Sequence, residues 1–567
     1  MRELSSGDPD GGDVSSTVAK LVDKGGEHPH NCEYTVTNRA LVRDTRVGEI
    51  GPAGMGAHTS SVLGTGPENS YGYMEDRVVV SQRNRLSAHD SVFLSWERPE
   101  QPMHVGECMV YEGHFTASDM VGMLKARMHL LPRYRQKVVQ APFGLAHPTW
   151  EDDADFDLDN HVAERQLPGP GDDRALSRFC GELYCELLDR RRPLWHLTVI
   201  HGHSSGNTVV FLKLHHAMVD GVSSVELIEV LHSTERSAPP PLPPVQEWTP
   251  RQVPSVIDRL RGVAADQASD VLDRVRGVTE LVRAGGPSSL LDRASATARA
   301  VIDTAPVMFR SLPETPFNAP IHAERDFAWV ELPIEETKAV RAALGGTVND
   351  MVLAILSGAL ARYMRRHGYE PDGRELQALC PVSVRRPDQS GNMGNLISMI
   401  VAPLYVGMSD AAERFSAEHA ATQDLKKRRQ AVGLHEIISA AEWCPAPLYS
   451  LVWKLWPRSY FPLHVTSTNV PGPKKPLFLG DRELLHWYPA GVQWTNNAMF
   501  LCTLSYREHL ILGPMVDPQI VPDVWDFAAD LHAAYQELRV AAGLSGSSST
   551  PDKPARPASP SAARRLR

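Results

Sequence analysis

The chain has 567 residues, of which 42% are hydrophobic and 22% are charged, and its formal net charge at pH 7 is −10. This length exceeds the size at which one hydrophobic core stops growing, so we expect two core-bearing units. The acidic balance, without a dense Lys/Arg run inside the expected core, excludes the electrostatic footprint of a nucleic-acid binder.

Seven cysteines are scattered along the chain without a C-x-x-C pair. This spacing argues against a disulfide framework or a structural zinc site and fits a reducing cytosol. The first twenty residues lack the apolar stretch of a secretion signal. The two longest apolar stretches, 351–361 and 396–408, are shorter than the roughly 18 to 20 residues that cross a bilayer, so both predict buried elements.

Both ends of the chain have the composition of disordered tails. Residues 1–79 contain twelve glycines and no Phe or Trp, which is too little apolar surface to offset chain entropy. Residues 546–567 are rich in Ser, Pro and Arg. Met74 precedes the first ordered pattern, which suggests the hypothesis that translation starts at Met74. Mass spectrometry of the native N-terminus tests it, and tryptic peptides from upstream of Met74 would contradict it.

A proline-dense segment, Ala238–Pro250, predicts a stiff linker between two halves. After it, apolar residues recur at helical spacing over 255–283, which predicts an amphipathic helix that either packs across the two domains or lies on lipid. Five Arg against five acidic residues in this segment favour packing. The predicted division is a domain at 80–237, a linker with crossover helices at 238–310, and a second domain at 311–545.

Strand and helix patterns alternate in both halves, which predicts a mixed α/β fold. The predicted helices cover residues 175–190, 222–233 and 347–366. The predicted strands cover residues 197–200, 208–216, 327–332, 376–382 and 499–506.

The segment Thr208–Gly221 (TVVFLKLHHAMVDG) is an apolar strand pattern that ends in two adjacent histidines. Side chains alternate across a strand, so His215 and His216 should face opposite ways, with His216 on the fully apolar face. An apolar setting keeps an imidazole neutral and able to accept a proton, which makes His216 the candidate general base. A satisfied core histidine beside an ordinary Asp220-Gly221 turn is the alternative interpretation.

Residues 215–221 match the HHxxxDG motif and resemble that segment of the bacterial wax ester synthase/acyl-CoA:diacylglycerol acyltransferases, within the CoA-dependent acyltransferases shaped like chloramphenicol acetyltransferase. Other segments are similar to landmarks of this family in the family's order: Leu86–Gly106, Pro193–Trp195, Thr315–Ile321, Thr347–Asp350, Pro381–Arg385, Gly391–Asn395, Asn469–Pro473 and Val521–Asp523. The resemblance covers residues 83–545. Thr468 stands where the family pattern has Ser.

The resemblance implies two chloramphenicol acetyltransferase-like α/β domains with mixed sheets and a tunnel between them. Acyl-CoA, as co-substrate, and a lipid alcohol would enter from opposite sides and meet at His216, which would take the proton of the acceptor hydroxyl. His215 would assist orientation. Asp220 would be mainly architectural and would pair with an arginine.

The resemblance also implies substrate-binding or structural roles for Gly221, Pro193, Leu194, Trp195, Asn349 and Asp350. Capping of the helix at 347–366 explains the last two equally well. Neither a bound cofactor nor a metal is expected. Five tryptophans of the second half line an acyl channel, mark an interfacial face or, as ordinary packing favours, fill the core: Trp443, Trp453, Trp456, Trp487 and Trp494.

The implied activity is that of an acyl-CoA:diacylglycerol O-acyltransferase, which makes triacylglycerol from long-chain acyl-CoA and diacylglycerol in lipid and glycerol metabolism. Wax ester synthesis from a long-chain fatty alcohol is the alternative, and no residue separates the two. The expected location is the cytoplasm, with peripheral binding to the inner membrane or to lipid droplets.

Two other patterns indicate different chemistry. Gly202–Gly206 satisfies the G-x-S-x-G pattern of serine esterases, but it lies between two predicted strands, where a hairpin loop is expected. His201 and His203 share a strand face and could approach His215 to hold zinc. A non-catalytic lipid-binding protein of the same fold is a further alternative, which the intact HHxxxDG motif disfavours.

Overall fold

The computed structural model describes residues 84–219, 221–243, 247–252, 254–265, 313–383, 397–427 and 463–544, together with residues 272, 276, 279, 283 and 295. The described residues all fall within one compact unit, Tyr71–Arg567. The predicted tails, the Met74 hypothesis and Asp220 lie outside the described residues.

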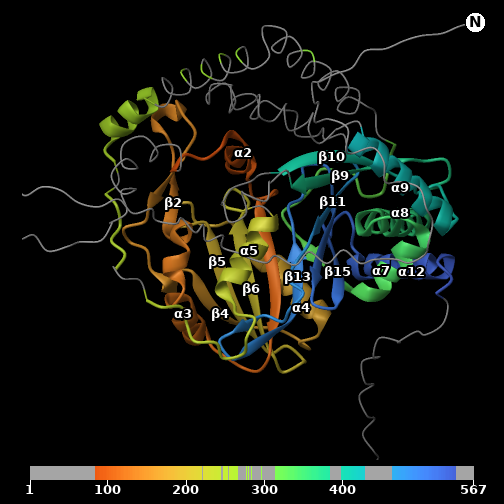
Figure 1. Ribbon diagram of the computed structural model, residues 1–567, viewed down its shortest axis with the longest axis horizontal. Coiled ribbons are helices and arrows are strands. Elements are labelled where there is room, and N and C mark those ends of the chain that lie inside the picture. The colour runs from red at the N-terminus through yellow and green to blue at the C-terminus, as the bar shows by residue number, and fades with distance from the viewer. Residues whose placement is uncertain are drawn as a thin grey trace, which may run out of the picture. The chain divides into compact units, whose positions relative to one another are not determined.

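A six-stranded mixed sheet is built mainly from the first half of the chain (Figure 1). Its strands lie in the order β12 (Phe478–Leu479), β13 (Arg482–Ala490), β1 (His104–Tyr111), β6 (Thr208–His215), β5 (Trp195–His201) and β4 (Val162–Gln166). Only β4 and β5 are parallel neighbours in it. Two of its strands, β12 and β13, come from far along the chain.

A second mixed sheet follows the order β10 (Ile397–Leu404), β9 (Leu376–Ser383), β11 (Val465–Val470), β14 (Met499–Tyr506), β15 (His509–Val516) and β7 (Asp326–Phe327), with β8 (Val330–Pro333) also paired to β15. In this sheet β11 is parallel to both of its neighbours. A separate hairpin pairs β2 (Gln136–Val139) with β3 (Thr149–Asp152).

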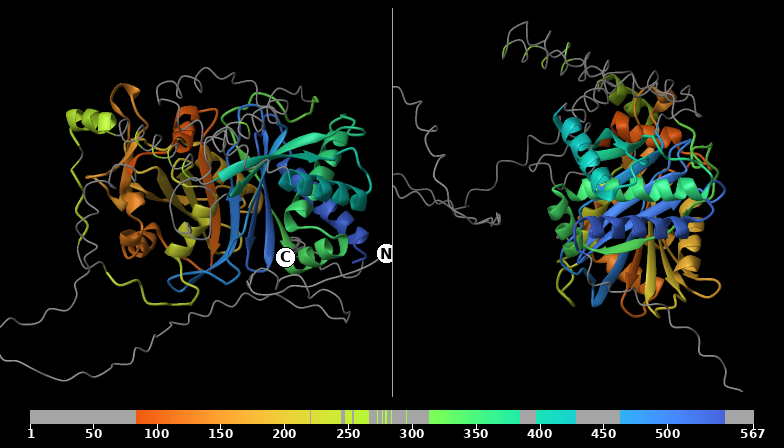
Figure 2. Two further views of the ribbon diagram at one scale, coloured as in Figure 1. Left: turned by 45° about the horizontal axis from the view of Figure 1, so that its top comes forward. Right: turned by 90° about the vertical axis from the view of Figure 1, so that its right-hand side faces the viewer.

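Helices flank both sheets. Those of the first half are α2 (Ala88–Trp96), α3 (Ala117–Lys125), α4 (Asp173–Cys185) and α5 (Gly221–Leu231), with short 3-10 turns at Met128–Leu130, Pro132–Arg135, Pro142–Gly144 and Leu158–Asn160. Those of the second half are α7 (Ile334–Leu344), α8 (Val348–Arg366), α9 (Ala411–Lys427) and α12 (Val524–Ala541). The second group gathers on the side of the second sheet that faces away from β5 and β6, as Figure 2 also shows.

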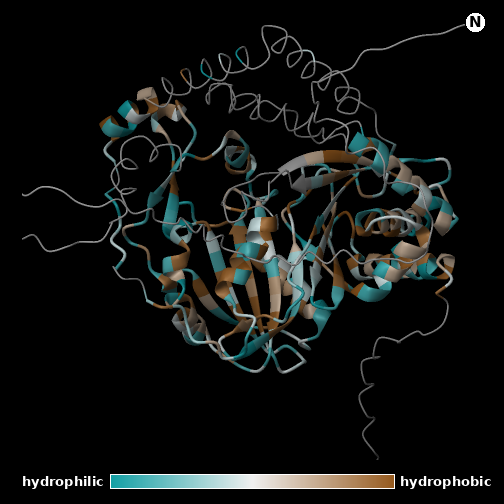
Figure 3. Ribbon diagram, viewed as in Figure 1, coloured by the Kyte–Doolittle hydropathy of each residue, from teal (hydrophilic) through white to brown (hydrophobic). Residues whose placement is uncertain are grey.

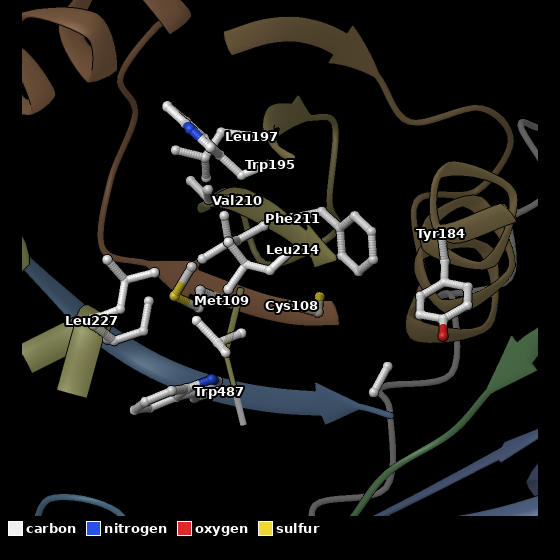
Figure 4. Packing of buried hydrophobic residues seen from close by; sticks show 14 of the residues in the cluster. Cys108, Met109, Tyr184, Trp195, Leu197, Val210, Phe211, Leu214, Leu227 and Trp487 are labelled. Atoms are coloured by element: carbon white, nitrogen blue, oxygen red, sulfur yellow. The ribbon is translucent and has the colours of Figure 1, made fainter. Parts of the chain in front are cut away.

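Every residue of the central strands β1 and β6 is buried, which explains why β6 reads as an almost continuous apolar run. Figure 3 shows the hydrophobic colouring along these strands. Figure 4 shows Met109, Val210, Leu214 and Trp487 packed around them. This first hydrophobic cluster extends to the facing side of the second sheet, and a second cluster fills the space between that sheet and its helices.

The predicted apolar helix at 347–366 is α8, which begins at a capping box. The Thr347 hydroxyl accepts the Asp350 backbone N–H at 3.3 Å, and the Asp350 carboxylate accepts the Thr347 N–H at 2.8 Å. Fourteen of its nineteen residues are buried, so α8 is a core helix. Among the described residues no single helix is long and apolar enough to cross a membrane. Helices α7 and α8 together have sufficient length and apolar composition, but the chain bends by 91° between them.

Several predicted boundaries are wrong, including that of the predicted helix 222–233, which ends at Leu231. The predicted strand 208–216 ends one residue early, at His215, because the chain turns there. The predicted helix 175–190 ends at Cys185, where the Lys213 ammonium donates to the Leu183 and Glu186 carbonyls at 2.6 and 2.5 Å and replaces the helical hydrogen bonds. The predicted strand 327–332 is two short strands, because Trp329 between them turns to stack on Tyr488.

The amphipathic segment after the linker is described over 256–265, where it is helical. Val256 is 58% exposed and Ile257 63% exposed, so this turn of the helix does not pack between the two halves. The charge balance of the segment had favoured such packing. The linker before it lies along the β2–β3 hairpin, since the Arg251 backbone N–H donates to Asp152 at 3.0 Å. Most of the remaining residues up to 283 lie outside the described part.

A buried carboxyl in the second core makes stability depend on pH. Glu418 of α9 accepts hydrogen bonds from the Ser357 hydroxyl at 2.6 Å and the Tyr405 N–H at 3.1 Å, and burial raises its pKa to about 8. The folded protein therefore keeps a proton that the unfolded chain loses above its ordinary pKa of about 4.5, so stability should fall as pH rises from about 4.5 to about 8.

A Glu418→Gln variant removes this titration. We expect its free energy of unfolding, relative to the wild type, to rise by roughly 2 to 4 kcal/mol between pH 5 and pH 8. Urea unfolding at three pH values measures it. Glu413→Gln on the same helix is the control, because Glu413 is exposed. Parallel stability curves for wild type and Glu418→Gln would contradict the expectation.

Candidate active site

A pocket of about 440 Å³ lies between the two sheets. Its lining includes Phe93 of α2, Val105 of β1, Val225 of α5, Leu379 of β9 and Phe500 of β14. This volume is in the range of small-molecule sites, and most of the wall is apolar. The two sheets thus enclose a cavity suited to an alkyl chain.

His216 is at the wall of this pocket. The chain leaves β6 at His215, and the His216 backbone N–H donates to the Met103 carbonyl at 2.8 Å, which places the residue directly after the strand. Its ring stacks on Phe93 with the ring centroids 4.1 Å apart and the planes at 11°. The orientation expected from strand alternation is therefore observed: the imidazole faces the cavity.

His215 faces away from the pocket and is fully buried. Its backbone N–H donates to the Leu194 carbonyl at 3.0 Å, and its Nδ1 accepts the Ala217 N–H at 3.0 Å. An Nδ1 that accepts a hydrogen bond carries no proton, so the ring proton of the neutral imidazole lies on Nε2. His215 thus links β5 to the turn that carries His216.

A buried carboxylate lies close to the Nε2 atom of His215. Glu97 Oε1 lies 3.3 Å from His215 Nε2 and 3.3 Å from His104 Nε2. Its Oε2 accepts from the Arg190 guanidinium at 2.8 and 3.1 Å. Burial alone would raise the pKa of Glu97, but its electrostatic interactions with the nearby His104 and His215 rings hold it well below its ordinary range. Glu97 is therefore ionised in the folded protein.

A second carboxyl lines the pocket itself. Glu107 of β1 is 3% exposed and accepts the Trp487 indole N–H at 2.6 Å. It lies opposite Leu212 in the β1–β6 register, so it shares the apolar sheet face. Burial raises its pKa to about 7 despite hydrogen bonds from Trp487 and Ser224. Glu107 can therefore hold a proton near neutral pH.

Two thiols also line the pocket. Burial raises the pKa of Cys380 and of Cys502 to about 12. A neutral thiol is a poor nucleophile, because the thiolate is the reactive form. These cysteines are consequently neutral thiols in the pocket wall.

Asn349 and Asp350, the two candidate site residues at the start of α8, have different surroundings. Asn349 lines the pocket. Asp350 is buried in the capping box and also accepts from the Thr422 hydroxyl at 2.5 Å, with His419 Nδ1 at 2.8 Å. Capping thus accounts for Asp350, whereas Asn349 lines the pocket from the second half, as does Asn469 of β11.

The remaining predicted residues surround the histidine turn. Gly221 lines the pocket at the start of α5, and a Cβ there would come within 2.9 Å of a Val470 methyl group. Leu194 is buried and holds His215 through its carbonyl, and the Trp195 indole donates to the Tyr134 carbonyl at 2.9 Å. Pro193 precedes them outside the pocket lining. Asp220 lies outside the described residues.

The alternative sites are not assembled. Ser204 lies in the loop of the β5–β6 hairpin, as its position between two strands predicts. His201 and His203 contact Glu164 and Asp173 at that end of the hairpin, whereas His215 is at the opposite end of β6. The zinc hypothesis is therefore wrong, because the hairpin places His201 and His203 at one end and His215 at the other. The described residues contain no group of three or more His, Cys, Asp or Glu that could hold a metal.

The sequence pattern assigns no role to several residues near the histidine pair: Phe93, Glu97, His104 and Glu107. The first three lie inside the Leu86–Gly106 segment, whose resemblance to a family landmark is the sequence signal that points to them. The two described tryptophans of the second-half group differ: Trp494 lines the pocket, whereas Trp487 is fully buried in the core. The other three tryptophans of that group lie outside the described residues.

The fold is similar to those of several solved structures. The wax ester synthase/diacylglycerol acyltransferase from Marinobacter aquaeolei VT8 superposes with a TM-score of 0.57 at 24% identity, over 81% of this chain and all of that one. The starter condensation domain of rhizomide synthetase, solved in complex with C8-CoA, gives a TM-score of 0.52 at 14% identity, over 82% of this chain and 96% of that chain. Two mixed sheets with a pocket between them thus define the chloramphenicol acetyltransferase-like fold of acyltransferases and condensation domains.

Sequence comparison is more specific. Residues 86–352 match the wax ester synthase/diacylglycerol acyltransferase catalytic domain, and residues 393–539 match the C-terminal domain of the same family. A Mycobacterium tuberculosis protein named as a diacylglycerol O-acyltransferase is 30% identical over 470 residues, which cover 80% of this chain and 90% of that protein. The chain belongs to the wax ester synthase/diacylglycerol acyltransferase family and is an acyltransferase.

Proposed function

We propose that the protein transfers a long-chain acyl group from acyl-CoA to diacylglycerol and so makes triacylglycerol. The observation that carries this proposal is the placement of the His216 imidazole at the wall of an apolar pocket between the two sheets. The family membership and the names of the mycobacterial relatives support the acceptor. The related domain solved with C8-CoA supports acyl-CoA as the donor.

In the proposed mechanism the acceptor hydroxyl binds beside His216, whose imidazole takes its proton. The oxygen then attacks the thioester carbonyl, and a tetrahedral oxyanion forms. Collapse of this intermediate breaks the C–S bond, and the leaving CoA thiolate takes up the proton from the imidazolium. General-base assistance of this kind contributes about 10² to 10⁴ in rate. This reaction proceeds with neither a bound cofactor nor a covalent enzyme intermediate.

The other predicted residues have supporting roles in this proposal. His215 fixes the turn that carries His216 through its bond from the Ala217 N–H. Asn349 lines the same pocket and can donate its amide N–H to the developing oxyanion. Gly221 keeps the wall clear at the start of α5. Asp220 has the architectural role expected from the motif.

An acceptor comparison tests the proposal. Purified protein is given radiolabelled oleoyl-CoA with either dioleoylglycerol or hexadecanol, and thin-layer chromatography and free CoA thiol are measured together. We expect triacylglycerol to form with stoichiometric thiol release. Wax ester formation alone would replace the proposed acceptor by a fatty alcohol, and thiol release without any lipid ester would indicate a thioesterase.

We further propose that the enzyme works at a lipid surface, because diacylglycerol resides in one. Exposed apolar side chains are carried by the β2–β3 loop and by the neighbouring helical segment, including Phe143 (88% exposed) and Ile257 (63%). Such exposed groups are typical of peripheral membrane contacts. The proposed location is the cytoplasmic side of the inner membrane or the surface of lipid droplets.

Flotation with phosphatidylcholine/phosphatidylglycerol vesicles containing diacylglycerol measures this binding. A Phe143→Ser/Ile257→Ser variant is expected to float at least about fivefold less than the wild type, because each apolar side chain loses its transfer free energy. Leu242→Ser is the control, since Leu242 is 87% exposed but lies in the linker. Equal loss in both variants would show that no particular surface binds.

A further inference from the structure

One short helix contacts both histidines of the motif through different side chains. The Phe93 ring of α2 stacks on the His216 ring at 4.1 Å. Glu97, which caps the end of α2, lies with Oε1 3.3 Å from His215 Nε2. The chain separation between these partners exceeds a hundred residues, so no local sequence pattern produces the arrangement.

The helix is itself held firmly. The Ser87 hydroxyl accepts the Asp90 N–H at 3.0 Å at its start, and seven of its nine residues are buried. At its end the Glu97 N–H donates to the Phe93 carbonyl at 3.1 Å, which joins the two contact residues through the backbone. Arg190 donates to both the Leu94 carbonyl and the Glu97 carboxylate at 2.8 Å. Phe93 and Glu97 are thus fixed relative to each other.

Each contact has a distinct chemical effect. A carboxylate only accepts, so Glu97 favours the His215 tautomer with its proton on Nε2, and Nδ1 stays free to accept the Ala217 N–H. The face of an aromatic ring attracts a cation. When His216 takes up a proton, the charge forms over the Phe93 face, within the 4.1 Å stacking distance.

We propose that Phe93 and Glu97 are positioning residues for the acyl transfer: Phe93 orients the His216 ring and favours its protonated form, and Glu97 sets the His215 tautomer that fixes the histidine turn. This inference rests on the proposed role of His216 as general base. Phe93 and Glu97 both lie in the Leu86–Gly106 segment, so the proposal also explains how this segment, which resembles a family landmark, contributes to the site.

Steady-state kinetics of Phe93→Leu and Glu97→Gln test the proposal. For Phe93→Leu we expect kcat to fall about 3- to 30-fold and the acid limb of the kcat–pH profile to move to lower pH by about half a unit to one unit. Phe93→Tyr keeps the aromatic face and should keep the wild-type acid limb. The titratable groups that share the pocket with His216 are unchanged in all these variants: His89, Glu107, Cys380 and Cys502.

For Glu97→Gln we expect kcat to fall about 10- to 100-fold through misorientation, with KM for acyl-CoA within about twofold, because Glu97 does not line the pocket. Leu94→Val is the matched control for a merely structural effect. It perturbs a buried residue of the same helix and should lower stability without moving the pH profile.

Two outcomes would overturn the inference. The first is a folded Phe93→Leu variant with wild-type kcat and acid limb together with an unimpaired Glu97→Gln, while His216→Ala is inactive; the proposed function would then stand without these positioning residues. The second is an acid limb that moves equally in Leu94→Val and Phe93→Leu. Full turnover by His216→Ala would instead remove the proposed function, which separates the two failures.

Discussion

A His216→Ala variant is expected to fold and to lose about 10² to 10⁴ of the wild-type kcat. The imidazole is the proposed acceptor of the hydroxyl proton, and an alanine methyl group cannot replace it. The fold should survive because the backbone N–H of residue 216, and not its side chain, bonds the Met103 carbonyl. Turnover is measured by release of free CoA thiol, and the thermal midpoint confirms that the variant is folded.

Ser204→Ala is the informative companion to this variant. It removes the hydroxyl of the G-x-S-x-G segment, which lies in the β5–β6 hairpin loop and outside the pocket lining. Its activity should equal that of the wild type. An inactive Ser204→Ala beside an active His216→Ala would reverse the assignment and indicate a serine hydrolase.

A Gly181→Ala variant is expected to lose about 1 to 3 kcal/mol of stability or more. Gly181 lies in α4, where alanine is normally the better helix former. A Cβ at this position, however, would come within 2.1 Å of the Arg325 carbonyl oxygen, which is backbone and cannot rotate away. The added methyl group would force α4 away from β7, and these two elements come from different halves of the chain.

Gly122→Ala in α3 is the matched control, since no heavy atom lies within 4 Å of a Cβ built there. It should stabilise the protein by about 0.5 to 1 kcal/mol. Urea unfolding of both variants measures the difference. Similar stabilisation of the two would show that α4 and β7 can separate without cost.

Local pattern predicted the elements that carry the histidines and the core. The apolar run of β6 and the alternation along it placed His216 toward a cavity and His215 away from it. The strong cap at Thr347 and the apolar residues after it predicted α8 within one residue. The orientation of the two histidines and the start of α8 both depend on residues that are close together along the chain, so a single sequence is sufficient to predict them.

Features that depend on distant partners were not predicted. The zinc hypothesis placed His201 near His215, but in an antiparallel hairpin the residue next to the loop pairs with the start of the following strand. The end of helix α4 depends on Lys213, and the proposed roles of Phe93 and Glu97 depend on histidines more than a hundred residues away. Tertiary contacts of this kind leave no periodic signal in the chain.

The late arrival of β13 in the first sheet has a consequence for synthesis of the protein. β13 pairs with the edge of β1, with Gly106 opposite Ala490, so the ribosome must add most of the chain before that edge is covered. Until then the nascent N-terminal half exposes an unpaired apolar strand, which is a site for aggregation or chaperone binding. Pairing of β13 also brings the Trp487 indole to Glu107, so this part of the pocket wall is completed only when synthesis is nearly finished.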